Sequence, residues 1–491
     1  MILIKLLKPI LFKLFVLFLL FLPIIINNSH GIFILIILLL LFIWELSSIC
    51  FKTFALYVLF ASLFYIHIVM HWGKSDIGSR IEVVLASPTY EIYEYFENFI
   101  NLIDVFLIIY FVLIYIFILF YKRTNLFFKK PVLKIMLCMV SAFYLIYLMS
   151  NTSTFNIFSK IQEAEKRNDF FEKRINYLNS ISQKNVDINA SKYDKIIIII
   201  GESASKHHMS IYNYNKITTP FLESIKPFVY NSIAPINGTR YSIAIDLTNA
   251  NVNNWNSFFK SESIVTNLKK AGYKTYWISN QRARGANDSY IASMASEADK
   301  SYFLNQTSKN YSNIDNVIVD KLKSIMPRKD EKEVFFLHLM GSHSSYSSRY
   351  KDIRLIKNPK NIDEEYDNSI YYTDYIISEI YKIFNKNKDN ILLVYFSDHG
   401  EVVSEQKHGH GFAPGYKDEY DVPLIIYSSV NNKYLYSLKK ENKIINLESL
   451  GDIIVNTLNN NNKKEISNSY EILNVSPNNI KDYRSLKRYK H

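Results

Sequence analysis

The distribution of hydrophobic positions divides the chain of 491 residues into two halves. Nearly every position before residue 150 is apolar or aromatic, whereas the remainder mixes polar and apolar positions as water-soluble domains do. Five apolar segments in the first half are each about long enough to cross ~30 Å of hydrocarbon. They cover residues 10–26, 31–49, 53–70, 102–121 and 132–149. The pattern predicts a membrane domain of five transmembrane helices over residues 1–150.

Lysines and arginines gather at particular ends of these segments, and an excess of such residues marks the cytoplasmic side of a membrane. They precede or enter the first segment (Lys5, Lys8, Lys13), separate the second from the third (Lys52) and surround the loop at 122–134. We therefore expect a cytoplasmic N-terminus in a multi-pass membrane protein. The loop at 71–101 and everything after residue 150 then lie outside, on the side of the membrane away from the cytoplasm.

Two stretches of the chain are expected to lie at the membrane surface. Residues 151–190 alternate apolar and charged positions and predict an amphipathic bridging segment, which would hold the following domain near the bilayer. The outer loop carries Glu91 and Glu94, which fit two interpretations. They belong to a solvated amphipathic helix, or they form a carboxylate cluster that pairs with the cationic amine of a lipid headgroup.

The second half alternates strand and helix patterns. Apolar runs of strand length occur at 195–200, 273–278, 334–340, 391–396 and 422–427. Helical patterns lie between them at 219–226, 261–271, 315–326 and 366–385. Such alternation predicts an α/β domain with a mostly parallel central sheet and helices on both faces. We assign this domain to residues 191–475 and expect the C-terminal tail, 476–491, to be loosely ordered.

Several of these strands end in chemically active side chains. The first runs into Glu202, the strand at 334–340 leads to His343, and the strand at 391–396 delivers Asp398 and His399. Thr239 follows a small turn, Asn237-Gly238. Since α/β sheets build their sites at the carboxyl ends of strands, these groups are expected to meet at one edge. Carboxylate, hydroxyl and imidazole ligands suit a divalent cation, with zinc favoured by the histidine.

Composition narrows the functional classes. The formal net charge is +12, but it comes largely from lysines that flank apolar segments, and no arginine-rich stripe or nucleic-acid motif occurs. Nucleic acid is therefore not an expected partner. Only two cysteines, Cys50 and Cys138, are present, and both lie in the apolar half. The second half thus has neither a disulfide nor a cysteine ligand, so any metal there is held by oxygen and nitrogen.

The motifs of the chain, taken in order, resemble those of the phosphoethanolamine transferases of the bacterial envelope. These enzymes modify lipid A or the lipooligosaccharide core and belong to the alkaline phosphatase and sulfatase-like superfamily. The motifs that carry the resemblance are IIGESASKHHMSIYNYNKITTP (200–220), GTRYSIAIDLT (238–248), AGYKTYWISNQ (271–281), LHLMGSH (337–343), YDNSIYYTDY (366–375), FSDHGE (396–401) and GHGF with DVPLIIY (409–427). The lipid A enzymes carry periplasmic disulfides, which are absent here, so the resemblance leans towards the branch that acts on core sugars.

The resemblance implies a role for each of these residues. Thr239 looks like the nucleophile that takes the phosphoethanolamine group from phosphatidylethanolamine and forms a phosphothreonine intermediate. Glu202, Asp398 and His399, with the Thr239 oxygen, look like the ligands of one tightly bound zinc ion. His343 and His410 look like the histidines that hold the transferred phosphate or a second metal, and His408 competes with His410 for that role.

Alternatives remain for both residues and function. Thr239 alone would also suit a turn hydroxyl, and Glu202 a helix cap. A phosphoglycerol transferase of the same superfamily would use phosphatidylglycerol instead, and an inactive envelope scaffold is a further alternative. A sulfatase is disfavoured, because the Cys/Ser-x-Pro-x-Arg setting of its nucleophile does not occur. The prediction is a monomeric, zinc-dependent phosphoethanolamine transferase whose acceptor is a glycolipid, either its lipid A or its core sugars.

Overall fold

A computed structural model describes residues 192–489 apart from 283–288, 306–313, 330, 462–463 and 465. It also describes residues 102–120, 174–178 and the single positions 67, 100, 180 and 188. These residues belong to two compact units, one with residues 102–120 and the other with those from 174 onwards. Each unit is described by itself.

The first unit contributes one described helix, α6 (Leu102–Phe120), which lies within the fourth predicted transmembrane segment. Its Asp104 is buried and accepts a hydrogen bond of 2.7 Å from Nδ1 of His67. Within the described ranges, no helix reaches the length and apolar character that a membrane crossing needs. Apart from the single position 67, the other four predicted segments lie outside the described residues, as do Glu91 and Glu94, so the five transmembrane helices stay a prediction.

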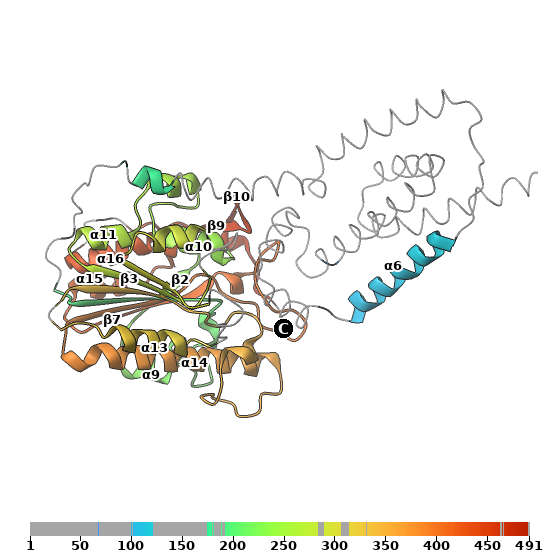
Figure 1. The fold of residues 1–491 in the computed structure, drawn as a ribbon, viewed down its shortest axis with the longest axis horizontal. Coiled ribbons are helices and arrows are strands. Elements are labelled where there is room, and N and C mark those ends of the chain that lie inside the picture. Colours follow the sequence, from blue (N-terminus) through green and yellow to red (C-terminus); the bar gives the residue numbers. More distant parts are fainter. Residues whose placement is uncertain are drawn as a thin grey trace, which may run out of the picture. The chain divides into compact units, whose positions relative to one another are not determined.

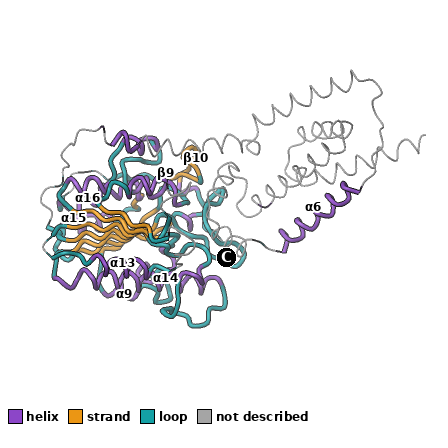
Figure 2. The backbone as a smooth tube through the Cα atoms, viewed as in Figure 1, coloured by secondary structure: helices purple, strands orange, loops and turns teal. Residues whose placement is uncertain are grey.

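The second unit is built on an eight-stranded sheet with helices on both faces (Figures 1 and 2). The strand order is β4-β3-β5-β1-β6-β7-β2-β8. Neighbouring strands are parallel except at β7, which runs antiparallel to both β6 and β2. The strands are β1 (Lys195–Gly201), β2 (Phe228–Ile233), β3 (Lys274–Ser279), β4 (Lys300–Phe303), β5 (Glu333–His338), β6 (Ile391–Ser397), β7 (Asp421–Ser428) and β8 (Ile445–Asn446). The predicted α/β class and mostly parallel sheet are confirmed.

The alternation of side chains along β1 explains why both faces of the sheet are covered. Ile196, Ile198 and Ile200 pack into one core, beneath α10 (Thr239–Asp246), α11 (Ile264–Lys270), α12 (Ser289–Ala295), α15 (Lys433–Glu441) and α16 (Leu450–Asn459). Ile197 and Ile199 pack into the opposite core, against α9 (Pro220–Ser224), α13 (Asn316–Ile325) and α14 (Ile362–Phe384). A strand buried on both faces reads as the continuous apolar run seen in the sequence.

The C-terminal tail is ordered, so the expectation that it is loose was wrong. β9 (Glu471–Asn474) and β10 (Ser476–Asp482) form an antiparallel hairpin across the expected domain boundary. Beyond it, Arg488 bonds Asp421 at 2.7 Å and Asp418 at 3.3 Å. The sequence pattern missed this order because long-range ion pairs, rather than a local apolar run, hold the tail in place.

The bridging segment is described only in part. The described residues 174–178 belong to the same unit as the sheet, and Arg174 anchors them. Its buried guanidinium pairs with Glu297 at 2.5 Å and donates to the carbonyl oxygens of Phe258 and Ser261, both at 3.1 Å. This end of the segment is therefore fixed by a buried ion pair. Contact between this segment and a membrane stays a prediction.

Candidate active site

The site lies at the carboxyl ends of the two central parallel strands. β1 and β6 are neighbours in a register that sets Gly201 opposite Ser397. The next residue on each strand, Glu202 and Asp398, is therefore brought to the same edge of the sheet. Both carboxylates are buried, with exposed fractions of 1% and 0%. Carboxylates are seldom buried unless they are paired or bound to a cation, so this edge has a strong demand for positive charge.

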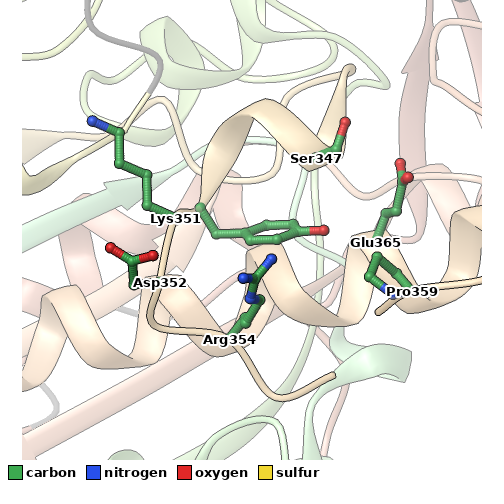
Figure 3. A pocket seen from close by; sticks show the side chains of 7 residues that line it. Ser347, Lys351, Asp352, Arg354, Pro359 and Glu365 are labelled. Carbon is green, nitrogen blue, oxygen red and sulfur yellow. The ribbon is translucent and has the colours of Figure 1, made fainter. Parts of the chain in front are cut away.

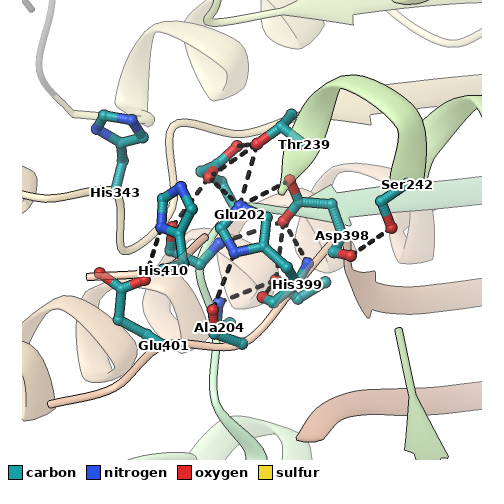
Figure 4. Close-up of polar contacts among 12 residues, drawn as sticks. Glu202, Ala204, Thr239, Ser242, His343, Asp398, His399, Glu401 and His410 are labelled. Atoms are coloured by element: carbon teal, nitrogen blue, oxygen red, sulfur yellow. Dashed lines mark hydrogen bonds and ion pairs between the residues drawn. The ribbon is translucent and has the colours of Figure 1, made fainter. Parts of the chain in front are cut away.

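Thr239 reaches this edge from the start of helix α10. Gly238 precedes the helix in an extended conformation and leads the chain in from the loop at 234–237. The Thr239 hydroxyl donates to Glu202, with distances of 3.1 Å to Oε2 and 3.3 Å to Oε1. Nε2 of His399 lies 3.1 Å from the same hydroxyl oxygen (Figure 4). The turn hydroxyl predicted as a nucleophile therefore lies directly between a carboxylate and an imidazole.

His399 is oriented by its own backbone. Its Nδ1 lies 2.9 Å from the carbonyl oxygen of Gly400, which can only accept, so Nδ1 carries a proton. Nε2 is then the nitrogen that faces Glu202 at 3.1 Å and Asp398 at 3.4 Å. A carbonyl that fixes the remote ring nitrogen is the usual arrangement behind a histidine that binds a metal.

The pKa values of the clustered side chains are shifted because negative charges lie close together. Burial, helped by the charge of Glu202, raises the pKa of Asp398 to about 7. Burial alone would lower the pKa of His399, but the charges of Asp398 and Glu202 outweigh it and raise that pKa to about 10. Burial also opposes ionisation of Glu202, yet His399 holds the pKa of that carboxyl well below its usual range. Two buried carboxylates thus compete for a single cationic partner.

These residues fit a divalent metal. Glu202, Asp398 and His399 each offer a ligand atom, and the three atoms lie within 4.8 Å of one another. Oδ2 of Asp398 is buried and accepts no hydrogen bond from the described residues, which leaves a lone pair directed at the cluster. A set of two carboxylates and one imidazole suits zinc with an open position for an exchanging group. We assign these three residues as the candidate metal ligands.

A second group of possible ligands adjoins the first. His399, Glu401 and His410 also bring three ligand atoms within 4.8 Å of one another. Nδ1 of His410 lies 2.8 Å from Oε2 of Glu401, and Tyr346 donates to Oε1 of the same carboxylate at 2.7 Å. The His410 and His399 rings lie 3.9 Å apart between centroids. The buried Glu401 carboxylate therefore holds His410 beside the His399 ring.

The two remaining histidines take different places. The His343 ring lies 6.3 Å from that of His410 and borders the cluster from the loop after β5, without joining the carboxylates (Figure 4). His408 lies 6.3 Å from the Tyr346 ring and belongs to neither group of possible ligands among the described residues. Of His408 and His410, the histidines of the GHGF motif and the segment before it, His410 is the one that the described geometry places beside the candidate metal ligand His399.

Sequence reasoning missed two residues that hold the site. Gln281 donates to Oε2 of Glu202 at 3.2 Å and to the carbonyl oxygen of Leu339 at 3.0 Å. It follows β3, so the rule that strands end in active side chains would have found it. Ser242, one turn into α10, donates to the carbonyl oxygen of Asp398. No local signal marks Ser242, because its partner lies 156 residues away.

Comparisons with known proteins agree with this geometry. A family model described as Sulfatase matches residues 194–455. The chain is 28% identical over 260 residues to the phosphoethanolamine transferase EptC of Escherichia coli K12, a match that covers 48% of this chain and 45% of that relative. The matched stretch thus spans less than half of the relative's length. The predicted resemblance to this group is confirmed.

Two solved structures share the fold. The periplasmic domain of EptC from Escherichia coli, in complex with zinc, has a TM-score of 0.53 at 23% identity and covers 61% of this chain and 95% of its own. The integral membrane lipooligosaccharide phosphoethanolamine transferase A of Neisseria meningitidis has a TM-score of 0.63 at 15% identity. That match covers 91% of this chain and 94% of the Neisseria protein. At these identities the likeness establishes the fold alone.

Proposed function

The chain belongs to the sulfatase family, and we propose that it is a phosphoethanolamine transferase of the bacterial inner membrane. It takes phosphoethanolamine from phosphatidylethanolamine and passes it to a glycolipid acceptor, the lipid A or core sugars of lipooligosaccharide. The catalytic domain is periplasmic, the N-terminus is cytoplasmic and the working unit is a monomer. The named activity of the similar EptC supports the reaction class.

The observation that carries this proposal is the position of the Thr239 hydroxyl. It lies within 3.3 Å of both oxygens of Glu202 and 3.1 Å from Nε2 of His399. A threonine hydroxyl is a weak nucleophile and needs activation by a base or a cation. A sulfatase would carry a different nucleophile, whose Cys/Ser-x-Pro-x-Arg setting the sequence lacks. The site is thus suited to phosphoryl transfer through threonine.

Zinc held by Glu202, Asp398 and His399 would supply a Lewis acid that favours the deprotonated hydroxyl and neutralises phosphoryl charge. The protein's own groups do the rest. Glu202, with a pKa well below its usual range, is ionised and holds the Thr239 hydroxyl through the hydrogen bonds described above. Helix α10 begins at Thr239, so the positive end of its dipole lies where an incoming phosphate would bind.

The reaction has two balanced half-reactions. In the first, the Thr239 hydroxyl loses its proton to solvent, its oxygen forms a bond to phosphorus, and the bond from phosphorus to the diacylglycerol oxygen breaks. His410 or His343 delivers a proton to that leaving oxygen, a role suited to imidazole near neutral pH. In the second, an acceptor oxygen attacks the phosphothreonine diester and its proton passes to the same histidine. The bond from phosphorus to the Thr239 oxygen breaks, and that oxygen regains a proton from solvent. Glu401 keeps His410 in position through the 2.8 Å contact.

The test is mass spectrometry of the peptide that contains Thr239, after the full-length protein in detergent has been incubated with phosphatidylethanolamine and no acceptor. We expect a phosphoethanolamine adduct on Thr239, absent from the Thr239→Ala variant, whose zinc content should stay near that of the parent. A phosphoglycerol adduct formed from phosphatidylglycerol would replace the proposed donor. If zinc-loaded protein gives no adduct from either lipid, the transferase assignment fails and a scaffold remains.

A further inference from the structure

A pocket outside the candidate active site lies on the segment that follows His343. It has a volume of about 440 Å³, and its lining includes Ser347, Tyr350, Lys351, Asp352, Arg354 and Glu365. Most of this lining comes from the 3-10 helix η4 (Tyr346–Arg349) and the loop that leads to α14. In the view of Figure 3, Arg354 lies between Lys351 and Glu365, and the Lys351 side chain extends away from both. None of these residues has a role in the mechanism above.

The loop at 350–361 is strongly basic. It carries four cations and one carboxylate, namely Lys351, Arg354, Lys357, Lys360 and Asp352. Within the described part of the chain, none of these four cations forms an ion pair, whereas Lys216 on the neighbouring loop pairs with Asp367 at 2.6 Å. Two of them, Lys351 and Arg354, line the pocket. The pocket lining therefore brings together two cations, Lys351 and Arg354, and two carboxylates, Asp352 and Glu365, and neither cation forms an ion pair with another described side chain.

The pocket is fixed to the loops that carry the active-site histidines. Arg349 donates to the carbonyl oxygens of His343 at 3.0 Å and Ser344 at 2.6 Å. At the other end of the loop, the N–H of Ile362 donates to Glu405 at 2.7 Å, in the segment between Glu401 and His410. Ser347 is four residues from His343, so their Cα atoms lie at most about 14 Å apart. A ligand in this pocket is close to the site.

We infer that this pocket binds the phosphate group of a phosphorylated saccharide, the headgroup of the glycolipid acceptor. The inference rests on the proposed function and names the chemistry of its acceptor. The planar fork of Arg354 matches phosphate oxygens, and Lys351 adds a second positive charge. The hydroxyl of Ser347 and the carboxylate of Glu365 suit sugar hydroxyls. A flat anionic membrane surface is a poorer fit, because it needs no cavity and offers no sugar hydroxyls to Ser347 and Glu365.

The experiment separates the two half-reactions in the full-length protein. Thr239 adduct formation from phosphatidylethanolamine reports the donor step, and transfer to lipooligosaccharide reports the acceptor step. The double variant Lys351→Gln/Arg354→Gln should raise the KM for phosphorylated lipooligosaccharide about tenfold or more, because it removes two charged contacts. It should change the KM little for the same lipooligosaccharide stripped of phosphate. The double variant Lys357→Gln/Lys360→Gln is the matched control, because it also removes two positive charges from the same loop but lies outside the pocket lining.

Each outcome decides the inference. Parental KM values in the double variant would overturn it, while a Thr239 adduct would leave the proposed function standing. Equal KM changes with both acceptors would also overturn the inference. If the double variant instead lost binding to phosphatidylglycerol vesicles and kept the parental acceptor KM, the loop would dock on the membrane and the inference would be overturned. If the parent forms no adduct, the proposed function fails, and binding of glucose 1-phosphate measured by NMR decides. Binding that the double variant loses supports the pocket, and absence of binding in the parent refutes it.

Discussion

Gly400 separates the candidate metal ligand His399 from Glu401, and replacing it with alanine tests how tightly the site depends on its neighbours. A Cβ atom at this position would lie 2.2 Å from the carbonyl oxygen of Asp418 and 3.2 Å from that of Asp421. Both obstacles are backbone atoms, so no flexible side chain can move aside. The Gly400 N–H also donates to the carbonyl oxygen of Glu419 at 2.8 Å, which ties the two segments together.

The size of the effect follows from that distance. Real Cβ atoms essentially never approach a heavy atom within 3.0 Å, so one segment must shift by about 0.8 Å or more. Overpacking of this kind costs about 1–3 kcal/mol, and the rigid backbone here favours the upper end. For a domain of this size that corresponds to a fall in Tm of roughly 5–10 °C. The shift also moves His399 away from Glu202 and weakens metal binding.

The assay compares Tm and zinc per chain in the full-length protein for Gly400→Ala and a control, Gly238→Ala. Gly238 immediately precedes Thr239, but its backbone is extended and an added Cβ would meet no atom within 4 Å. We expect the control to keep the parental zinc content and a free energy of unfolding within about 0.5 kcal/mol of the parent. Parental Tm and zinc content in Gly400→Ala would refute the reasoning, because the close approach would then be absent.

Three further changes probe contacts that the site and the tail depend on. Tyr346→Phe removes the donor to Glu401 and should lower kcat about tenfold with little change in KM, as His410 loses its support; an unchanged kcat contradicts this role. Burial would raise the pKa of Asp421, but His207 and Lys206 outweigh it and hold that pKa below its usual range. Asp421→Asn should therefore cost about 3 kcal/mol of unfolding free energy at pH 7. Since the Asp421 carboxylate stabilises the fold only while ionised, the difference in unfolding free energy between Asp421→Asn and the parent should shrink as the pH falls below about 4. Denaturant titrations that gave the same difference at every pH would rule this out. Arg174→Gln should cost about 3 kcal/mol in thermal unfolding, because it leaves Glu297 buried without its cation, whereas the exposed control Arg328→Gln should cost less than about 1 kcal/mol.

Local sequence patterns determined the class of the domain and most of its candidate site. The five apolar runs of strand length in the second half each predicted a strand that the structure contains. They were recognisable because a strand buried on both faces needs apolar residues at every position. The same runs located Glu202, Asp398 and His399, since these residues follow strand ends directly and need no knowledge of distant contacts. Thr239 was found through its motif.

Some features of the fold were beyond the reach of local patterns. β2 mixes polar and apolar positions and was not predicted, although it lies inside the sheet next to β7. The antiparallel direction of β7 depends on how the chain returns to the sheet, which a single apolar run does not encode. Ordering of the tail depends on Arg488 meeting Asp421, 67 residues away. These features arise from pairing between distant segments.

Tertiary structure alone also decided how the site is supported. It placed His410 against Glu401 and beside the His399 ring. It brought Gln281 to Glu202 across a separation of 79 residues. A sequence identifies which groups can ionise or bind a metal, since that is a property of each side chain. Which of them share a charge, a proton or a cation depends on distances of about 3 Å, and only the packed chain sets those distances.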